Sequence, residues 1–147
     1  MEIISGSDPR ISWHHDSDFG RVVQCQYPDK DAHSGAIGNW GELVARNYLA
    51  RQGIFTVRHA VFRLPSLLVV SDLFHLPSAT LYEVKTTVGS APPNFLGKIW
   101  LDRELVHQRV AKQIVYLHVK SRDSTNVTFG QYKAIRSAGF KFIVIEV

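Results

Sequence analysis

Apolar residues recur along the chain with two different spacings, and these spacings separate expected helices from expected strands. Over residues 39–52, apolar side chains recur every three to four positions, which is the period of an amphipathic helix. Asn39 is a suitable N-cap for this helix, and Gly53 stands where a left-handed C-terminal stop is expected. The pattern therefore predicts a helix that ends before Gly53.

Three extended segments follow this helix. Residues 54–62 contain alternating and β-branched side chains, residues 67–74 are almost wholly apolar up to Asp72, and residues 80–87 come after a turn at residues 75–78. Short runs of this kind, bounded by turn residues, are typical of β-strands. We expect a three-stranded meander whose last two strands are joined by a short hairpin.

The C-terminal part of the chain alternates between helical and extended patterns. Residues 102–112 show a helical pattern, and residues 113–119 form an apolar strand. Residues 129–137 then form a short helix that ends near Gly139, and residues 140–147 form a final strand. This order predicts an α/β fold in which helices flank a mixed central sheet.

The chain of 147 residues has the length of one domain. We expect residues 1–38 to form an N-terminal arm or hairpin, residues 39–119 to form the core, and residues 120–147 to add the C-terminal helix and strand. No segment approaches the ~20 apolar residues of a membrane-spanning helix. The N-terminus lacks the pattern of a secretory signal, and Cys25 is a single cysteine. These features predict a cytoplasmic protein.

Basic residues outnumber acidic ones, 17 against 13, which gives a net charge of +4 and a pI near 9.4. This charge fits a polyanionic partner such as nucleic acid, because each neutralised phosphate releases counterions. Several basic side chains gather around the second predicted helix, where they form either a phosphate-contacting surface or a solvated helix face. These are Lys98, Arg103, Arg109 and Lys112.

Two acidic residues stand at the ends of neighbouring predicted strands. Asp72 ends an apolar run, and Glu83 is followed by Val84 and Lys85. Side chains alternate between the faces of a strand, so Glu83 and Lys85 point the same way and Val84 points the other way. If the two strands pair, Asp72 meets Glu83, and a hard divalent cation would relieve the repulsion between their carboxylates. The alternative is that Glu83 and Lys85 form a same-face pair on an exposed strand and have no function.

Glu42 lies at the edge of the apolar stripe of the first predicted helix. There it could supply a third carboxylate to a metal ion, directly or through water. An acidic residue in a first helical turn also complements the helix dipole. The sequence leaves both interpretations open.

The arrangement of Glu42 on a helix, Asp72 at a strand end and Glu83-Val84-Lys85 on the next strand resembles the PD-(D/E)XK nuclease superfamily, which has the restriction-endonuclease-like fold. The resemblance covers about residues 40–119 and is nearest to Holliday-junction-resolvase-like and restriction-like members. It implies an αβββαβ core in which Asp72 and Glu83 bind Mg²⁺ or Mn²⁺ with help from the Val84 carbonyl. It also implies an auxiliary role for Glu42 and makes Lys85 the catalytic lysine.

The chain departs from the family pattern at two positions, and Gln108, Gln113 and Thr86 are candidate supporting residues. Ser71 replaces the proline that often precedes the first acid. Gln108 or Gln113 would stand for the glutamine that many members carry on the following helix, and Thr86 follows the catalytic lysine. Lys112 stands where the RecB-like branch has a tyrosine after its glutamine. The resemblance to that branch is therefore weak.

These features lead to one principal hypothesis about function. We expect an endodeoxyribonuclease that hydrolyses DNA phosphodiester bonds with a Mg²⁺-activated water and needs no small-molecule cofactor. We expect it to act as a homodimer, with the final strand and the N-terminal arm available for the interface. The alternatives are a non-catalytic nucleic-acid-binding module of the same fold and an RNA-cleaving nuclease.

Overall fold

The computed structural model describes residues 3–29, 34–86, 95–120 and 129–147. Three helices and two β-sheets make up these segments, so the expected α/β class is confirmed. None of the helices in the described segments is both long and apolar enough to cross a membrane.

The main sheet has five strands in the order β3-β6-β7-β8-β9. The strands β3, β6 and β7 are antiparallel, whereas β7, β8 and β9 are parallel. The sheet is therefore mixed, as expected. Its strands are β3 (Val57–Arg58), β6 (Leu73–His75), β7 (Thr80–Lys85), β8 (Gln113–Lys120) and β9 (Lys141–Glu146).

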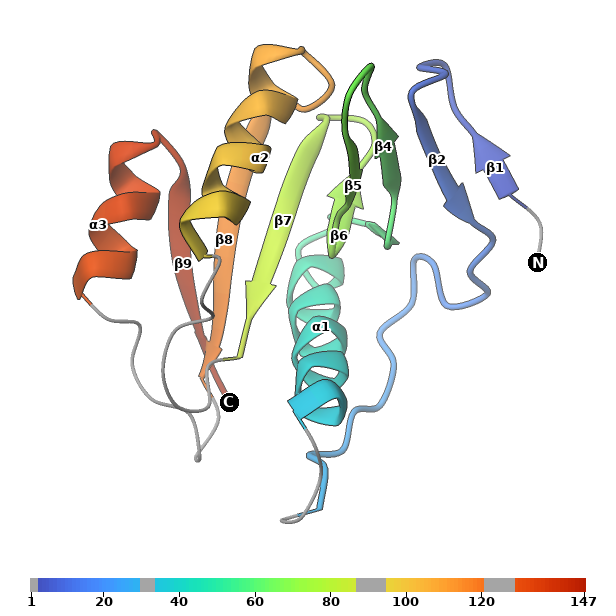
Figure 1. The fold of residues 1–147 in the computed structure, drawn as a ribbon. Helices are drawn as coiled ribbons and strands as arrows, with labels where there is room; N and C mark the ends of the chain where they lie inside the picture. The colour runs from blue at the N-terminus through green and yellow to red at the C-terminus, as the bar shows by residue number, and fades with distance from the viewer. Residues whose placement is uncertain (1–2, 30–33, 87–94, 121–128) are drawn as a thin grey trace.

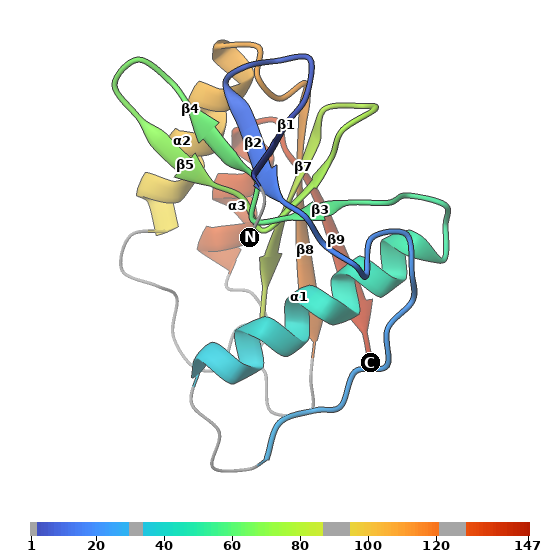
Figure 2. The same ribbon diagram turned by 90° about the vertical axis from the view of Figure 1, so that its right-hand side faces the viewer.

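Helices cover both faces of this sheet. Helix α1 (Ser34–Ala50) crosses one face, and helices α2 (Phe95–His107) and α3 (Phe129–Ser137) lie on the other (Figures 1 and 2). Residues that alternate along β7 follow this division, because Tyr82 and Val84 pack in the cluster with α1 and Leu81 packs in the cluster with α2 and α3. The sheet is thus buried on both sides, and any polar group at its centre is shielded from water.

A second, four-stranded antiparallel sheet lies beside the main sheet, with the order β1-β2-β4-β5 (Figure 1). The N-terminal hairpin supplies two of its strands, and residues 15–29 then run along α1. There the backbone N–H of Val23 donates to the Asn47 side chain at 2.8 Å. Residues 21–25 form no strand. The strands are β1 (Ile3–Ser5), β2 (Ile11–His14), β4 (Val61–Arg63) and β5 (Leu68–Val70).

The prediction of a meander was wrong in one respect. Each of its first two strands is divided into two shorter strands, one in each sheet. Residues 54–62 form β3 and β4, and residues 67–74 form β5 and β6. One antiparallel register runs through both pairs, so they are two halves of one bent hairpin. The bend lies at His59, whose φ of 54° is incompatible with an extended strand. Asp72 lies opposite this bend, and its carbonyl accepts the His59 N–H at 3.1 Å.

The helix boundaries also differ from the prediction. Helix α1 begins at Ser34, so Asn39 lies inside it and is not its N-cap, but the left-handed stop at Gly53 is confirmed by a φ of 78°. Helix α2 spans Phe95–His107 and not residues 102–112. The apolar period fails to mark α2 because its buried side carries Asp102 as well as apolar residues. The predicted strand end at Thr87 lies outside the described residues.

A close approach of α1 to the end of β7 depends on Gly41. A Cβ atom at this position would lie 2.1 Å from Cγ2 of Thr86, the residue after Lys85. Only glycine therefore allows the helix to pack at this distance from the strand that carries Glu83 and Lys85.

We expect Gly41→Ala to destabilise the protein by about 1–3 kcal/mol, because the overpacked methyl group forces α1 away from Thr86. Gly38→Ala is the matched control in the same helix: a Cβ there meets nothing within 4 Å, so this variant gains about 0.5–1 kcal/mol from helix propensity. Denaturant unfolding measures both changes. Thr86→Ser removes Cγ2 and should restore part of the loss; equal stabilities for the two alanine variants would contradict the account.

Candidate functional site

The two acids of the predicted motif lie opposite each other in the main sheet. In the β6–β7 pair, Leu73 faces Tyr82 and Phe74 faces Leu81. Continued by one residue, this antiparallel register places Asp72 opposite Glu83. Directly opposed residues share a face of the sheet, with Cβ atoms about 5 Å apart. The hairpin thus brings together the carboxylates that the sequence separates.

Asp72 is fixed at the bend of the hairpin. Its Oδ2 accepts the backbone N–H of Val84 at 2.8 Å, and no described residue donates a hydrogen bond to Oδ1. Burial raises the pKa of Asp72, whereas the Val84 hydrogen bond and the nearby ammonium groups of Lys85 and Lys98 lower it. Val84 thus contributes its backbone to the site, while its side chain packs on the opposite face of the sheet.

Glu83 is a buried acid whose charge is incompletely compensated. Only 1% of its side chain is exposed, and its Oε1 atom makes no hydrogen bond of good geometry to any described residue. Burial raises the pKa of Glu83 well above its ordinary value, and the carboxylates of Asp102 and Asp72 raise it further. Lys98 and Lys85 act in the opposite direction. A carboxylate placed in this way gains strongly from a bound cation.

Asp102 is a third acid at the site, and the sequence interpretation missed it. It lies on α2, fully buried, and its Oδ2 accepts the hydroxyl of Tyr116 at 2.6 Å. Tyr116 is the β8 partner of Glu83, so this bond anchors Asp102 beside Glu83. Burial is the main cause of its raised pKa. Its spacing from buried Ile99 and Leu105, three residues to either side, was the available signal that it points inward.

Lys85 lies two residues after Glu83 on the same side of β7, as the alternation of strand side chains requires. It is half-buried. Its ammonium group lowers the pKa values of Asp72, Glu83 and Asp102, so it acts electrostatically on all three acids. The catalytic role expected for Lys85 stays a prediction.

Glu42 interacts with His59 and Arg58. Its Oε1 lies 2.8 Å from Nε2 of His59 and 3.6 Å from the guanidinium of Arg58. The hydrogen bond to Glu42 raises the pKa of His59, and the charge of Glu42 raises that of Asp72. Because α1 begins at Ser34, Glu42 lies in the middle of the helix, and the helix-dipole interpretation is wrong.

The structure does not bring the two predicted supporting glutamines to the acids. Gln113 pairs with Thr80, whereas Glu83 pairs with Tyr116, so Gln113 lies about 10 Å away along the strand. Gln108 lies in the turn after α2, where its carbonyl accepts a hydrogen bond from Arg10 at 2.9 Å. Neither side chain therefore takes part in the candidate site.

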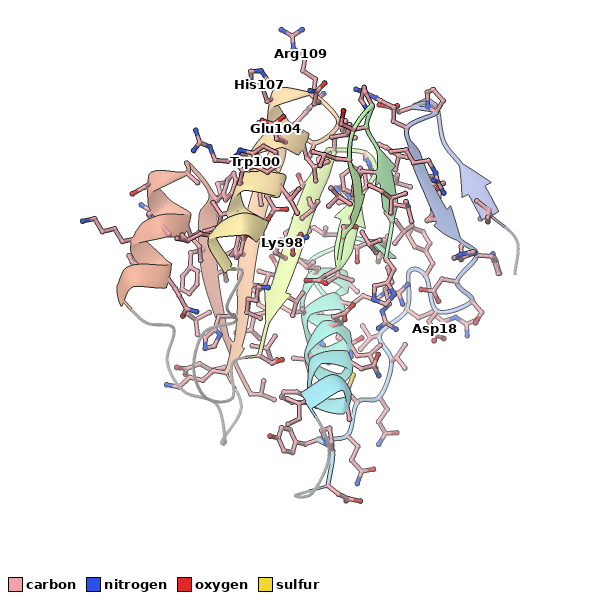
Figure 3. The ribbon with its side chains drawn as sticks, viewed as in Figure 1. Asp18, Lys98, Trp100, Glu104, His107 and Arg109 are labelled. Carbon is pink, nitrogen blue, oxygen red and sulfur yellow. The ribbon has the colours of Figure 1, made fainter. Side chains whose placement is uncertain are left out.

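The four basic residues around α2 do not form one surface. Figure 3 shows Lys98 near the start of α2 and Arg109 beyond its other end. Lys98 is turned toward Glu83 and Asp102, whereas Arg103, Arg109 and Lys112 are exposed. Lys112 precedes β8, at the end of the sheet away from Lys85.

The site can offer oxygen ligands to a hard cation. Among the described segments, no three His, Cys, Asp or Glu side chains are grouped closely enough to enclose a metal ion. Asp72 and Glu83 could supply two carboxylates, and a hard cation such as Mg²⁺ keeps several waters in sites of this kind. The buried Oε1 atom of Glu83, which lacks a well-aligned hydrogen bond, fits this use.

Comparison with known proteins does not assign a function to this site. No protein-family model matches the chain, and no curated protein matches it.

We expect Glu83→Gln to stabilise the metal-free protein. Because the pKa of Glu83 is raised in the folded protein, folding favours the protonated carboxyl group. The protonated group contributes its full stability below the ordinary pKa of 4.5, and this contribution is lost as pH rises through the folded-state pKa. Glutamine carries no charge, so the advantage of the variant in melting temperature should grow as pH rises above 4.5. Each kcal/mol regained corresponds to ~2–4 °C.

Thermal unfolding in the presence of a chelator, at several pH values, measures this difference. Glu146→Gln, at an exposed position on β9, serves as the control and should show no such trend. An advantage of Glu83→Gln that does not change with pH would contradict the uncompensated charge.

Proposed function

We propose that the chain is a metal-dependent endonuclease that hydrolyses DNA phosphodiester bonds. The observation that carries this proposal is the opposition of Asp72 and buried Glu83 across β6 and β7, with Lys85 on the same side of β7. Two acids and a lysine in this arrangement suit phosphodiester hydrolysis, because the reaction needs a cation, an activated water and compensation of negative charge.

The order of elements around the main sheet supports a restriction-endonuclease-like core. Helix α1 is followed by β3, β6 and β7, then by α2 and β8, which is the αβββαβ order of the PD-(D/E)XK superfamily that the motif resembles. Asp72 precedes β6 and Glu83 lies on β7, which supports the proposed assignment. The second sheet and the α3–β9 unit are additions to this core.

Mg²⁺, with Mn²⁺ as a substitute, fits the donor atoms of the site. We propose that Asp72, Glu83 and the Val84 carbonyl hold it, with Glu42 acting from outside the ligand set through its influence on Asp72 and His59. When bound, such an ion polarises a phosphate oxygen and lowers the pKa of water.

The protein's own residues then position the reactants. Lys85 is only half-buried, so its ammonium can reach a phosphate oxygen or the attacking water while it stays near the acids. There it would orient the water and offset charge that develops on the phosphate. The net charge of +4 supports a nucleic-acid substrate, and a homodimer would allow each copy to cut one DNA strand.

Plasmid cleavage tests this function. Wild-type protein with Mg²⁺ or Mn²⁺ should nick or linearise supercoiled DNA, and Lys85→Ala or Asp72→Asn should lower the rate by about 10²-fold or more. Lys112→Ala removes an exposed lysine from the far end of the sheet and should retain nearly full activity.

Circular dichroism and melting temperature show whether each variant is folded. Folded wild-type protein that cleaves no duplex, branched or single-stranded DNA would overturn the proposal, and binding without cleavage would indicate a nucleic-acid-binding module. A parallel digest of RNA identifies an RNA-cleaving nuclease.

A further inference from the structure

Lys98 places a positive charge at the same oxygen atom that the proposed metal would use. Its Nζ lies 3.3 Å from Oε1 of Glu83 and 3.8 Å from Oδ1 of Asp102. The lysine side chain is 23% exposed, whereas the two acids are 1% and 0% exposed. The ammonium therefore reaches inward from the surface to two buried carboxylates.

Asp102 gives Lys98 a second partner at the site. The two residues are one helical turn apart on α2, which places their side chains on the same side of the helix. The Tyr116 hydroxyl holds Oδ2 of Asp102, so the other oxygen, Oδ1, is the one nearest to Lys98. No described residue donates a well-aligned hydrogen bond to Oδ1 or to Oε1 of Glu83. Among the described residues, Lys98 is the cation within salt-bridge distance of both oxygens.

A divalent cation that binds Oε1 of Glu83 would compete with Lys98 for that oxygen. A magnesium ion approaches carboxylate oxygens to about 2.0–2.1 Å. With the ammonium still beside the same oxygen, two positive charges would face each other in a site of low dielectric, where repulsion is strong. Metal binding through Oε1 therefore favours movement of the ammonium away from this oxygen.

We infer that Lys98 is a resident counter-ion that occupies Glu83 in the metal-free protein and is displaced from it when a divalent cation binds, while Asp102 retains it at the site as a positioning residue. This inference rests on the proposed function, since it concerns the same metal site. Lys98 thus compensates the buried acids before the metal arrives and competes with the metal for Glu83.

The charges of the site agree with such an exchange. When all are ionised, the three carboxylates of Asp72, Glu83 and Asp102 exceed the ammonium groups of Lys85 and Lys98 by one negative charge. A divalent cation would reverse this to one positive charge, and one phosphodiester would neutralise it. The displaced Lys98, which already reaches the surface, is then available to a phosphate.

Metal binding to Lys98→Met tests the competition. Methionine keeps a long flexible side chain without the charge, so we expect Mn²⁺, titrated calorimetrically without DNA, to bind about tenfold more tightly than to wild type. Lys112→Met is the control and should bind as wild type does. Mn²⁺ binding to Lys98→Met that is equal to or weaker than that of wild type would overturn the inference. If neither protein binds Mn²⁺, the proposed function itself fails.

Labelling of the wild-type protein gives a test that does not depend on whether the variant folds. Acetylation of Lys98, followed by mass spectrometry, should increase severalfold when Mn²⁺ saturates the protein, whereas that of exposed Lys112 should not change. In Asp102→Asn, labelling of Lys98 in the Mn²⁺-bound protein should increase further, because no buried charge then retains the ammonium. Unchanged labelling of Lys98 in wild-type protein that binds Mn²⁺ would overturn the inference.

Discussion

The burial of the Glu83 carboxylate between the sheet and α2 is the constraint on which the rest of the site depends. A charged oxygen at 1% exposure is costly unless cations or hydrogen bonds compensate it. The fold meets this cost only in part, with one ammonium at 3.3 Å and no well-aligned hydrogen bond to Oε1 within the described segments. Residual cost of this kind is typical of functional sites, where stability is given up for chemistry.

The bent hairpin explains how this carboxylate acquires a partner. Because the two segments leave the main sheet at His59 and Ser71, Asp72 lies one residue beyond the last β6–β7 pair. Its carboxylate can therefore lie beside that of Glu83 and also accept the Val84 N–H at 2.8 Å. A straight hairpin would continue the ladder past this point, and the second sheet would not form. The same bend thus shapes the fold and aligns the two acids.

Much of this arrangement could be predicted from sequence, because it follows from strand periodicity. The apolar run before Asp72 and the alternation through Glu83 and Lys85 determine which faces these side chains share. The α/β class followed from the order of the patterns. The division of strands between two sheets could not be predicted in the same way, because a local pattern does not report a left-handed backbone at His59.

The helix α2 shows why part of the site was missed. Its inward side carries Lys98 and Asp102 among apolar residues. In the sequence alone, where the contacts of these residues are not visible, such a mixture indicates a solvated helix face. Only the tertiary contact with Glu83 and Tyr116 makes these charges favourable inside the protein. The engagement of Glu42 by His59 likewise depends on the bend and not on the periodicity of α1.

A crystal structure of the protein soaked with Mn²⁺, with the ion located by anomalous scattering, tests the metal site most directly. We expect one ion in contact with carboxylate oxygens of both Asp72 and Glu83, at about the distances that hard cations take to oxygen. An ion bound instead between Glu42 and His59, or an empty site at saturating Mn²⁺, would contradict the account.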